Sequence, residues 1–225
     1  MVLGSDSDTT ACIESIITLA KSTLPSATSL PMFIKQFYRN ADADEFVERD
    51  PQSLFESARA SWDLLQTSNG LDPAIRIYNP DKQSDKWESN FTIIDLVLTD
   101  MPFLVDSISM EMQRQGLAIH FLVHPLLVTE RQKNGLLEKI FAYNHANSLN
   151  NAKRESVIHI EIDRIVDKTQ QESVCTGLKL VLAEIKRAVS DWSFMREKIL
   201  EVKAEAANAP ANVDERERAE ILTFL

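Results

Sequence analysis

Apolar residues in the first 70 positions recur every three or four residues, which is the spacing of amphipathic helices. These stripes run through residues 13–20, 31–39 and 51–65. Asp50 before Pro51 marks a helix start, because an aspartate caps free N–H groups and proline suits the first turn. Asn69-Gly70 marks a helix end. We therefore predict an N-terminal helical segment over residues 1–72.

From residue 73 the apolar period shortens to two, which is typical of strands. The expected strands cover 75–78, 91–99, 117–128, 136–143 and 157–165. A helix is expected over 102–115, and Asn134-Gly135 predicts a hairpin turn. Residues 171–205 carry a helical stripe that is either continuous or broken near Ser190-Asp191.

This order of elements predicts an α/β (α+β) fold with a ferredoxin-like antiparallel sheet and helices on one face. The sheet domain would span residues 73–205. Alternation predicts that one sheet face meets the helices with these residues: Ile94, Leu96, Leu98, Ile119, Phe121, Val123, Ile158, Ile160 and Ile162. The other face would carry Asp95, Val97, His120, Leu122, His124, His159 and Glu161. Since that face mixes polar and apolar residues, we predict that it is open and contacts another subunit or domain.

Residues 206–225 read as a linker followed by the start of a next domain. The chain stops within the apolar run Ile221-Leu222-Thr223-Phe224-Leu225. A helix that ends without a cap or a polar tail indicates a fragment of a longer polypeptide. The alternative is a terminal helix that docks its last turn on the core.

Charge and composition narrow the class of protein. The net charge is −10, with 34 acidic and 24 basic residues, and no basic stripe offers a nucleic-acid surface. No apolar run approaches the ~18 residues of a membrane span, and the first residues lack a signal-peptide pattern. Two isolated cysteines suit a reducing compartment. We expect a cytoplasmic protein that binds neither nucleic acid nor membrane.

The candidate chemistry is sparse. His120 and His124 lie about 13 Å apart on a straight strand, which is too far for two ligands of one metal ion. Asp100 and Asp106 bracket a predicted helix start, where carboxylates are favoured by the free N–H groups, so we interpret them as helix-terminus residues. The chain has only five glycines and contains no GxSxG or GxGxxG pattern. It therefore has neither a nucleophile motif nor a dinucleotide-binding motif. We predict no catalytic residue and no metal site.

Several stretches together resemble one protein family. They are TDMPFLVDSISMEMQRQGLAIHFLVHPLL, ESVIHIEIDR, VLAEIKRAVSDWSFM, IRIYNPD and FYRNADADEF. Taken in their order along the chain, from about residue 30 to the end, they resemble the N-terminal region of the large NAD-specific glutamate dehydrogenases of bacteria, which contains ACT-like modules. The resemblance implies a parent enzyme that converts L-glutamate, NAD and water to 2-oxoglutarate, ammonium and NADH. It also implies that the catalytic domain and the NAD site lie downstream, with no cofactor in this segment.

ACT modules usually bind small effectors, often amino acids, at an Asp-x-Pro-Gly-x-Leu turn. The resemblance places this turn at Asp100, Met101, Pro102, Phe103 and Leu104, with Phe103 in the place of the glycine. It implies contacts with downstream domains of the same chain and a homo-oligomer.

Three functions stay open at this point. The first is a non-catalytic regulatory and assembly region, and the second is a module that binds an amino-acid effector. The third is a free-standing small enzyme that uses His120, His159 and Glu161.

Overall fold

The computed structural model describes residues 6–41, 49–141 and 152–208, together with 216, 219, 220 and 223. The chain divides into two compact units, residues 1–181 and 182–225. The first unit contains the N-terminal helices, the whole sheet and the first part of the last helix. The second contains the remainder of that helix.

The N-terminal segment forms the predicted helices. They are α1 (Asp6–Thr23), α2 (Leu30–Phe37) and α4 (Pro51–Thr67). The Asp50 side chain accepts a hydrogen bond from the backbone N–H of Ser53 at 3.0 Å, which confirms the predicted cap of α4. Helix α4 ends just before Asn69-Gly70, and Gly70 has a φ of 63°. Such a left-handed turn suits glycine, which has no Cβ to clash.

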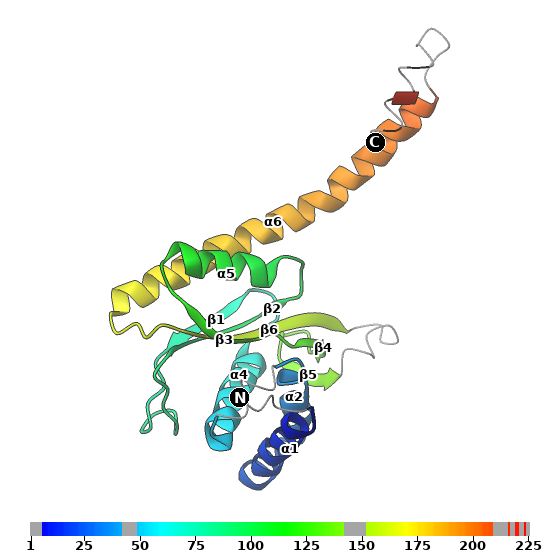
Figure 1. Ribbon diagram of the computed structural model, residues 1–225. Coiled ribbons are helices and arrows are strands. Elements are labelled where there is room, and N and C mark those ends of the chain that lie inside the picture. Colours follow the sequence, from blue (N-terminus) through cyan, green and yellow to red (C-terminus); the bar gives the residue numbers. More distant parts are fainter. Residues whose placement is uncertain are drawn as a thin grey trace. The chain divides into compact units, whose positions relative to one another are not determined.

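Six antiparallel strands form one sheet (Figure 1). They are β1 (Ala74–Tyr78), β2 (Thr92–Thr99), β3 (Ile119–Val123), β4 (Leu126–Arg131), β5 (Leu137–Phe141) and β6 (Lys153–Ile162). Strand β6 is central, because it pairs with β2 along one edge and with both β3 and β4 along the other. The single strand expected over 117–128 is divided at His124-Pro125, where proline removes a ladder donor. The hairpin at Gly135 joins β4 to β5 as predicted.

Helix α5 (Leu104–Arg114) and the first part of α6 (Lys168–Ala207) lie over one face of this sheet (Figure 1). The buried residues on this side are Ile94, Leu96, Leu98, Leu104, Ile108, Met112, Ile158, Ile160, Ile162, Val174 and Leu178. The two helices approach closely at Gly177, where an added Cβ would collide with the Glu111 carboxylate. This is the helix-covered face that the alternation of β2 and β6 predicts.

The opposite face is covered by the N-terminal helices, with α4 against β2, β5 and β6. One core joins Phe33, Phe55 and Trp62 of these helices to Val97 and Val157 of the sheet. The prediction of an open face is therefore corrected. The N-terminal helices carry enough apolar surface to cover this face of the sheet. Alternation within the strands does not reveal which segment covers a face.

The face assignment of β3 is also corrected. Phe121 pairs with Glu161 and Val123 pairs with His159, whereas Leu122 pairs with Ile160. Cross-strand partners lie on the same face, so Phe121 and Val123 point toward α4 and Leu122 points toward α5. The cause is an irregularity in the ladder between Ile119 and Phe121, since one extra residue reverses every following side chain.

Helix α6 is continuous through Ser190-Asp191. Between Trp192 and Val202 its large apolar residues are exposed: Trp192, Phe194, Met195, Ile199, Leu200 and Val202. None of the helices in the described ranges is long and apolar enough to cross a membrane. Because α6 reaches Ala207, the linker expected from residue 206 begins inside this helix. The remaining linker positions 209–212 and most of the expected terminal helix lie outside the described residues.

Candidate functional site

The turn before α5 holds a residue in an unusual backbone conformation. Phe103 has a φ of 71°, in the left-handed region, and its side chain is 66% exposed. This is the position at which the resembling turn carries glycine, the residue that adopts such a φ without steric cost. Helix α5 begins at Leu104, so Pro102 lies before the helix and not in it.

Asp100 does not cap α5, which corrects its interpretation as a helix-terminus residue. Its Oδ1 accepts a hydrogen bond from the Ser156 hydroxyl at 2.8 Å, and Ser156 Oγ lies 2.9 Å from His124 Nε2. The Asp100 N–H donates to the carbonyl of Arg154 at 3.0 Å. Asp100 therefore ties the end of β2 to β6. Asp106, in contrast, lies in the first turn of α5 as predicted.

A group of buried polar side chains lies between α4 and the sheet. The His159 Nδ1 atom is 2.7 Å from Asp95 Oδ1, and its Nε2 atom is 3.0 Å from the Ser57 hydroxyl. Asp95 also accepts hydrogen bonds from Ser61 and Arg76, each at 2.7 Å. Asp95 and His159 are completely buried. Two residues of the predicted interface face are thus the centre of an internal network.

Glu161 and Arg49 extend this network toward the surface. Arg49 Nη1 lies 2.7 Å from Glu161 Oε1, and the Arg49 guanidinium stacks 4.1 Å from the centre of the Phe121 ring. Glu161 Oε1 is 3.9 Å from His159 Nε2. The structure therefore brings Asp95, His159 and Glu161 together, with Val97 buried on the same face.

The charges in this network are set by its contacts. Burial alone would lower the pKa of His159, but the hydrogen bonds and negative charges of Asp95 and Glu161 raise it to about 9. Burial opposes ionisation of both carboxylates. Nevertheless, the positive charge of His159 keeps the pKa of Asp95 and Glu161 below their usual values, assisted by Arg76 and Arg49 respectively. At neutral pH the network consists of two carboxylates, two guanidinium groups and an imidazolium.

Ser57, His159 and Asp95 have the order of contacts of a nucleophile–base–acid triad. Three observations argue against that chemistry. His159 is already protonated at pH 7 and cannot accept a proton. Ser57 is a buried residue inside α4, where neighbouring N–H groups are used by the helix and offer no oxyanion hole. The Ser57 hydroxyl also donates to Tyr38, whose own hydroxyl donates to the Leu54 carbonyl at 2.7 Å.

A second buried ion pair fixes the other end of α4. Arg131 Nε lies 2.9 Å from Glu155 Oε2, and both side chains are almost fully buried. The Arg131 guanidinium also donates to the carbonyls of Ser68, Gly135 and Leu65 at 2.7, 2.9 and 3.2 Å. One arginine thus links the end of α4, the β4–β5 turn and β6.

The other predicted site residues lie apart from the buried network. His120 Nε2 is 2.7 Å from Asp163 Oδ1, and its ring stacks on Phe91. Within the part of the chain that the structure describes, no hydrogen bond or ion pair joins His120 to His159 or Glu161, the other members of the set proposed for a free-standing enzyme. Among the described residues, no group of three or more His, Cys, Asp or Glu side chains could hold a metal ion.

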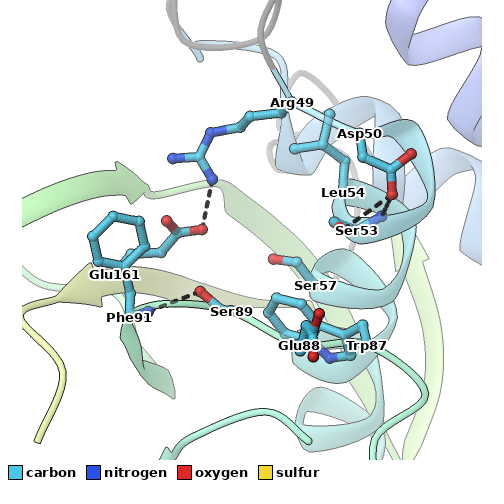
Figure 2. Close-up of a pocket in the computed structure, with 10 residues that line it drawn as sticks. All are labelled: Arg49, Asp50, Ser53, Leu54, Ser57, Trp87, Glu88, Ser89, Phe91 and Glu161. Atoms are coloured by element: carbon cyan, nitrogen blue, oxygen red, sulfur yellow. Dashed lines mark hydrogen bonds and ion pairs between the residues drawn. The ribbon is translucent and has the colours of Figure 1, made fainter. Parts of the chain in front are cut away.

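A cavity of about 420 Å³ lies beside the network. Figure 2 shows ten residues that line it, from the start of α4, the segment before β2, and β6: Arg49, Asp50, Ser53, Leu54, Ser57, Trp87, Glu88, Ser89, Phe91 and Glu161. Only Glu161 among them was a candidate from the sequence. Sequence reasoning missed Arg49 and Ser57, because both lie far from Glu161 along the chain. One signal for the serine was available, since Ser57 and Ser61 lie at helical spacing on an apolar helix face.

Comparison with known proteins decides the family. The family described as "Glutamate dehydrogenase, ACT1 domain" matches residues 33–178. The chain belongs to this family. The matched residues contain the buried network, the cavity and the Asp100 turn, so all three are features of the ACT1 domain.

Two curated relatives extend the comparison. The chain is 30% identical over 207 residues to the NAD-specific glutamate dehydrogenase of Pseudomonas aeruginosa, covering 92% of this chain and 12% of that protein. It is 30% identical over 200 residues to the NAD-specific glutamate dehydrogenase of Halomonas elongata, covering 88% of this chain and 12% of that protein. The chain spans 12% of the length of each relative. No solved structure matches the chain significantly.

Proposed function

We propose that this chain is a non-catalytic N-terminal regulatory and assembly region of a large NAD-dependent glutamate dehydrogenase. The observation that carries the proposal is the ACT1 match over residues 33–178, in a chain that spans 12% of two relatives named NAD-specific glutamate dehydrogenases. The parent reaction would be the oxidative deamination of L-glutamate by NAD. NAD would bind the parent enzyme outside this chain, in the cytoplasm.

The chemistry of the described residues supports a non-catalytic role. The arrangement Ser57–His159–Asp95, which has the order of contacts of a catalytic triad, holds its proton on the imidazole. Its serine lies inside a helix and is buried. A group that is buried, protonated and fully bonded stabilises an interior and does not attack a substrate.

An assembly role rests on what the domain would have to contact. In this proposal its partners are the downstream domains of the same chain and further copies in a homo-oligomer. The sheet face that carries Asp95 and His159 is buried under α4. Contacts with these partners would therefore have to use other surfaces of the domain. His120, at the end of the sheet, is partly exposed.

A second candidate function is effector binding, and the cavity beside Glu161 favours it. Effector binding at the turn of Asp100, Met101, Pro102, Phe103 and Leu104 stays a prediction. Phe103 has the backbone conformation of the glycine that it replaces, but it adds a large side chain at the place where a ligand would approach.

The experiment compares this chain with the parent enzyme. NADH formation from L-glutamate and NAD is followed by absorbance. We expect activity from the parent enzyme and none from this chain alone. Deleting the region that corresponds to residues 33–178 from the parent should leave chemical turnover measurable but change its subunit assembly in light scattering or its response to amino acids. NADH formation by the isolated chain would contradict the non-catalytic assignment, and an unchanged deletion variant would contradict the regulatory and assembly role.

A further inference from the structure

The cavity beside the buried network contains an unsatisfied charged group. Glu161 lies in its wall, and the Glu161 side chain is only 4% exposed. Oxygen Oε1 receives the Arg49 guanidinium at 2.7 Å. Oxygen Oε2 is buried and has no hydrogen-bond donor among the residues that the structure describes. A buried carboxylate oxygen without a donor is unfavourable, because it has lost its hydrogen bonds to water and has formed none within the protein.

The carboxylate keeps its charge despite burial. The His159 imidazolium, 3.9 Å away, and the hydrogen bond from Arg49 hold the pKa of Glu161 below its usual value, against the effect of burial. The Arg49 guanidinium is already engaged, with Glu161 Oε1 on one side and the Phe121 ring on the other. A ligand with its own N–H donors would satisfy the remaining oxygen.

The rest of the lining fits a small cation. Trp87 and Phe91 contribute aromatic rings, whose faces attract positive charge. Asp50 and Glu88 add two carboxylates, of which Asp50 also accepts from Ser53 and Glu88 pairs with Lys82. The hydroxyl of Ser89 accepts the Phe91 N–H at 3.1 Å and keeps a lone pair for a second donor. Figure 2 shows these groups around the space in front of α4.

A primary ammonium group has the matching chemistry. It carries one positive charge and three N–H donors, and it has no acceptor that would meet the carboxylates. We propose that this cavity binds a small ligand through its protonated primary amine, with the Glu161 carboxylate as the main acceptor and Trp87 and Phe91 as aromatic walls. The amine could belong to an alkylamine or to the α-amino group of an amino acid. A regulatory role for this site rests on the function proposed above, whereas binding of the amine can be measured on this chain alone.

Three ligands of nearly equal size distinguish an alkylamine from an amino acid as the source of the amine. Propylamine carries only the amine, L-2-aminobutyrate carries the amine and a carboxylate, and butyrate carries only the carboxylate. Each is titrated into the full 225-residue chain, and amide chemical shifts are followed by NMR. We expect propylamine or L-2-aminobutyrate, or both, to shift the amides around Glu161, and butyrate to have no effect there. Binding of L-2-aminobutyrate alone would identify an amino acid as the source of the amine.

Glu161→Gln keeps the shape of the side chain and removes its charge. Since a hydrogen bond to a charged group is the main contact, we expect the Kd of the binding amine to rise roughly tenfold to a hundredfold. The matched control is Glu111→Gln, which changes another buried, arginine-paired glutamate, in α5 on the opposite face of the sheet. Its Kd should equal that of the unchanged chain.

Some outcomes would overturn the proposal. They are no shift with either amine, equal binding of butyrate, or an unchanged Kd in Glu161→Gln. If Glu161→Gln does not fold, Ser53→Leu decides, because it places a larger side chain at the half-buried cavity lining without touching the buried network. Retention of amine binding by Ser53→Leu would then exclude this cavity. None of these results depends on dehydrogenase activity, so failure here is separate from failure of the proposed function.

Discussion

The imidazolium of His159 should make the stability of the domain depend on pH in a defined interval. Its pKa is raised from 6.5 to about 9 in the folded state. Below pH 6.5 both folded and unfolded states bind the proton, and the stabilisation is fully present. As the pH rises toward 9 only the folded state retains the proton, so the free energy of unfolding decreases. At 1.36 kcal/mol for each pKa unit, the loss across this interval is at most about 3 kcal/mol.

The groups that face or bias His159 come from several elements. They are Asp95 of β2, Arg76 of β1, Glu161 of β6, Ser57 of α4, Phe37 of α2, Phe121 of β3, and Arg49. Both carboxylates have a lowered pKa and stay ionised from pH 6.5 to 9. The pH dependence in this interval therefore reports the imidazole and not its partners.

Urea unfolding at a series of pH values measures the effect, and the imidazole proton shifts of His159 give its pKa directly. The variant His159→Asn should lose the decrease between pH 6.5 and 9, although it is less stable throughout. The control His120→Asn removes an imidazole that is 37% exposed and should keep the decrease. Equal pH profiles for His159→Asn and the unchanged chain would refute the assignment of a buried imidazolium.

Three further substitutions test the packing of the domain. Arg131→Met leaves the fully buried Glu155 carboxylate without its charged partner, so urea unfolding should show a loss of about 3–5 kcal/mol, whereas Lys198→Met, which breaks an ion pair with two exposed side chains, should change stability little; equal effects would contradict the first assignment. Phe103→Gly should be more stable than Phe103→Ala by about 1 kcal/mol in the same assay, because only glycine adopts a φ of 71° without strain, and the reverse order would exclude strain at this turn. Gly177→Val should lower the thermal midpoint of unfolding by forcing α6 away from α5, and an unchanged midpoint would show that the neighbouring side chains yield easily.

Local signals in the sequence predicted the elements well. Asp50-Pro51 placed the start of α4, and Asn134-Gly135 placed the β4–β5 turn, because capping and turn geometry depend on a few adjacent residues. The antiparallel α/β class followed from the order of the elements. The alternation of Ile158, His159 and Ile160 correctly separated the two faces of β6.

Tertiary relations were harder to predict. The face of β3 was reversed because an irregularity between Ile119 and Phe121 leaves no pattern in the sequence. The polar residues of β2 and β6 read as an open face, since alternation shows which side chains share a face but not what covers it. Buried charges need partners, and that requirement, applied to Asp95 and His159, would have pointed to the serines of α4.

The pairing of Asp95 with His159 also selects how the two central strands align during folding. Strands β2 and β6 are rich in isoleucine and leucine, so a shift of two residues would leave the same face covered and cost little apolar contact. Such a shift would place Asp95 opposite either Glu161 or Val157. The first alternative brings two carboxylates together, and the second buries an aspartate against a valine. The imidazole thus distinguishes one alignment from its nearest competitors in the most apolar part of the sheet.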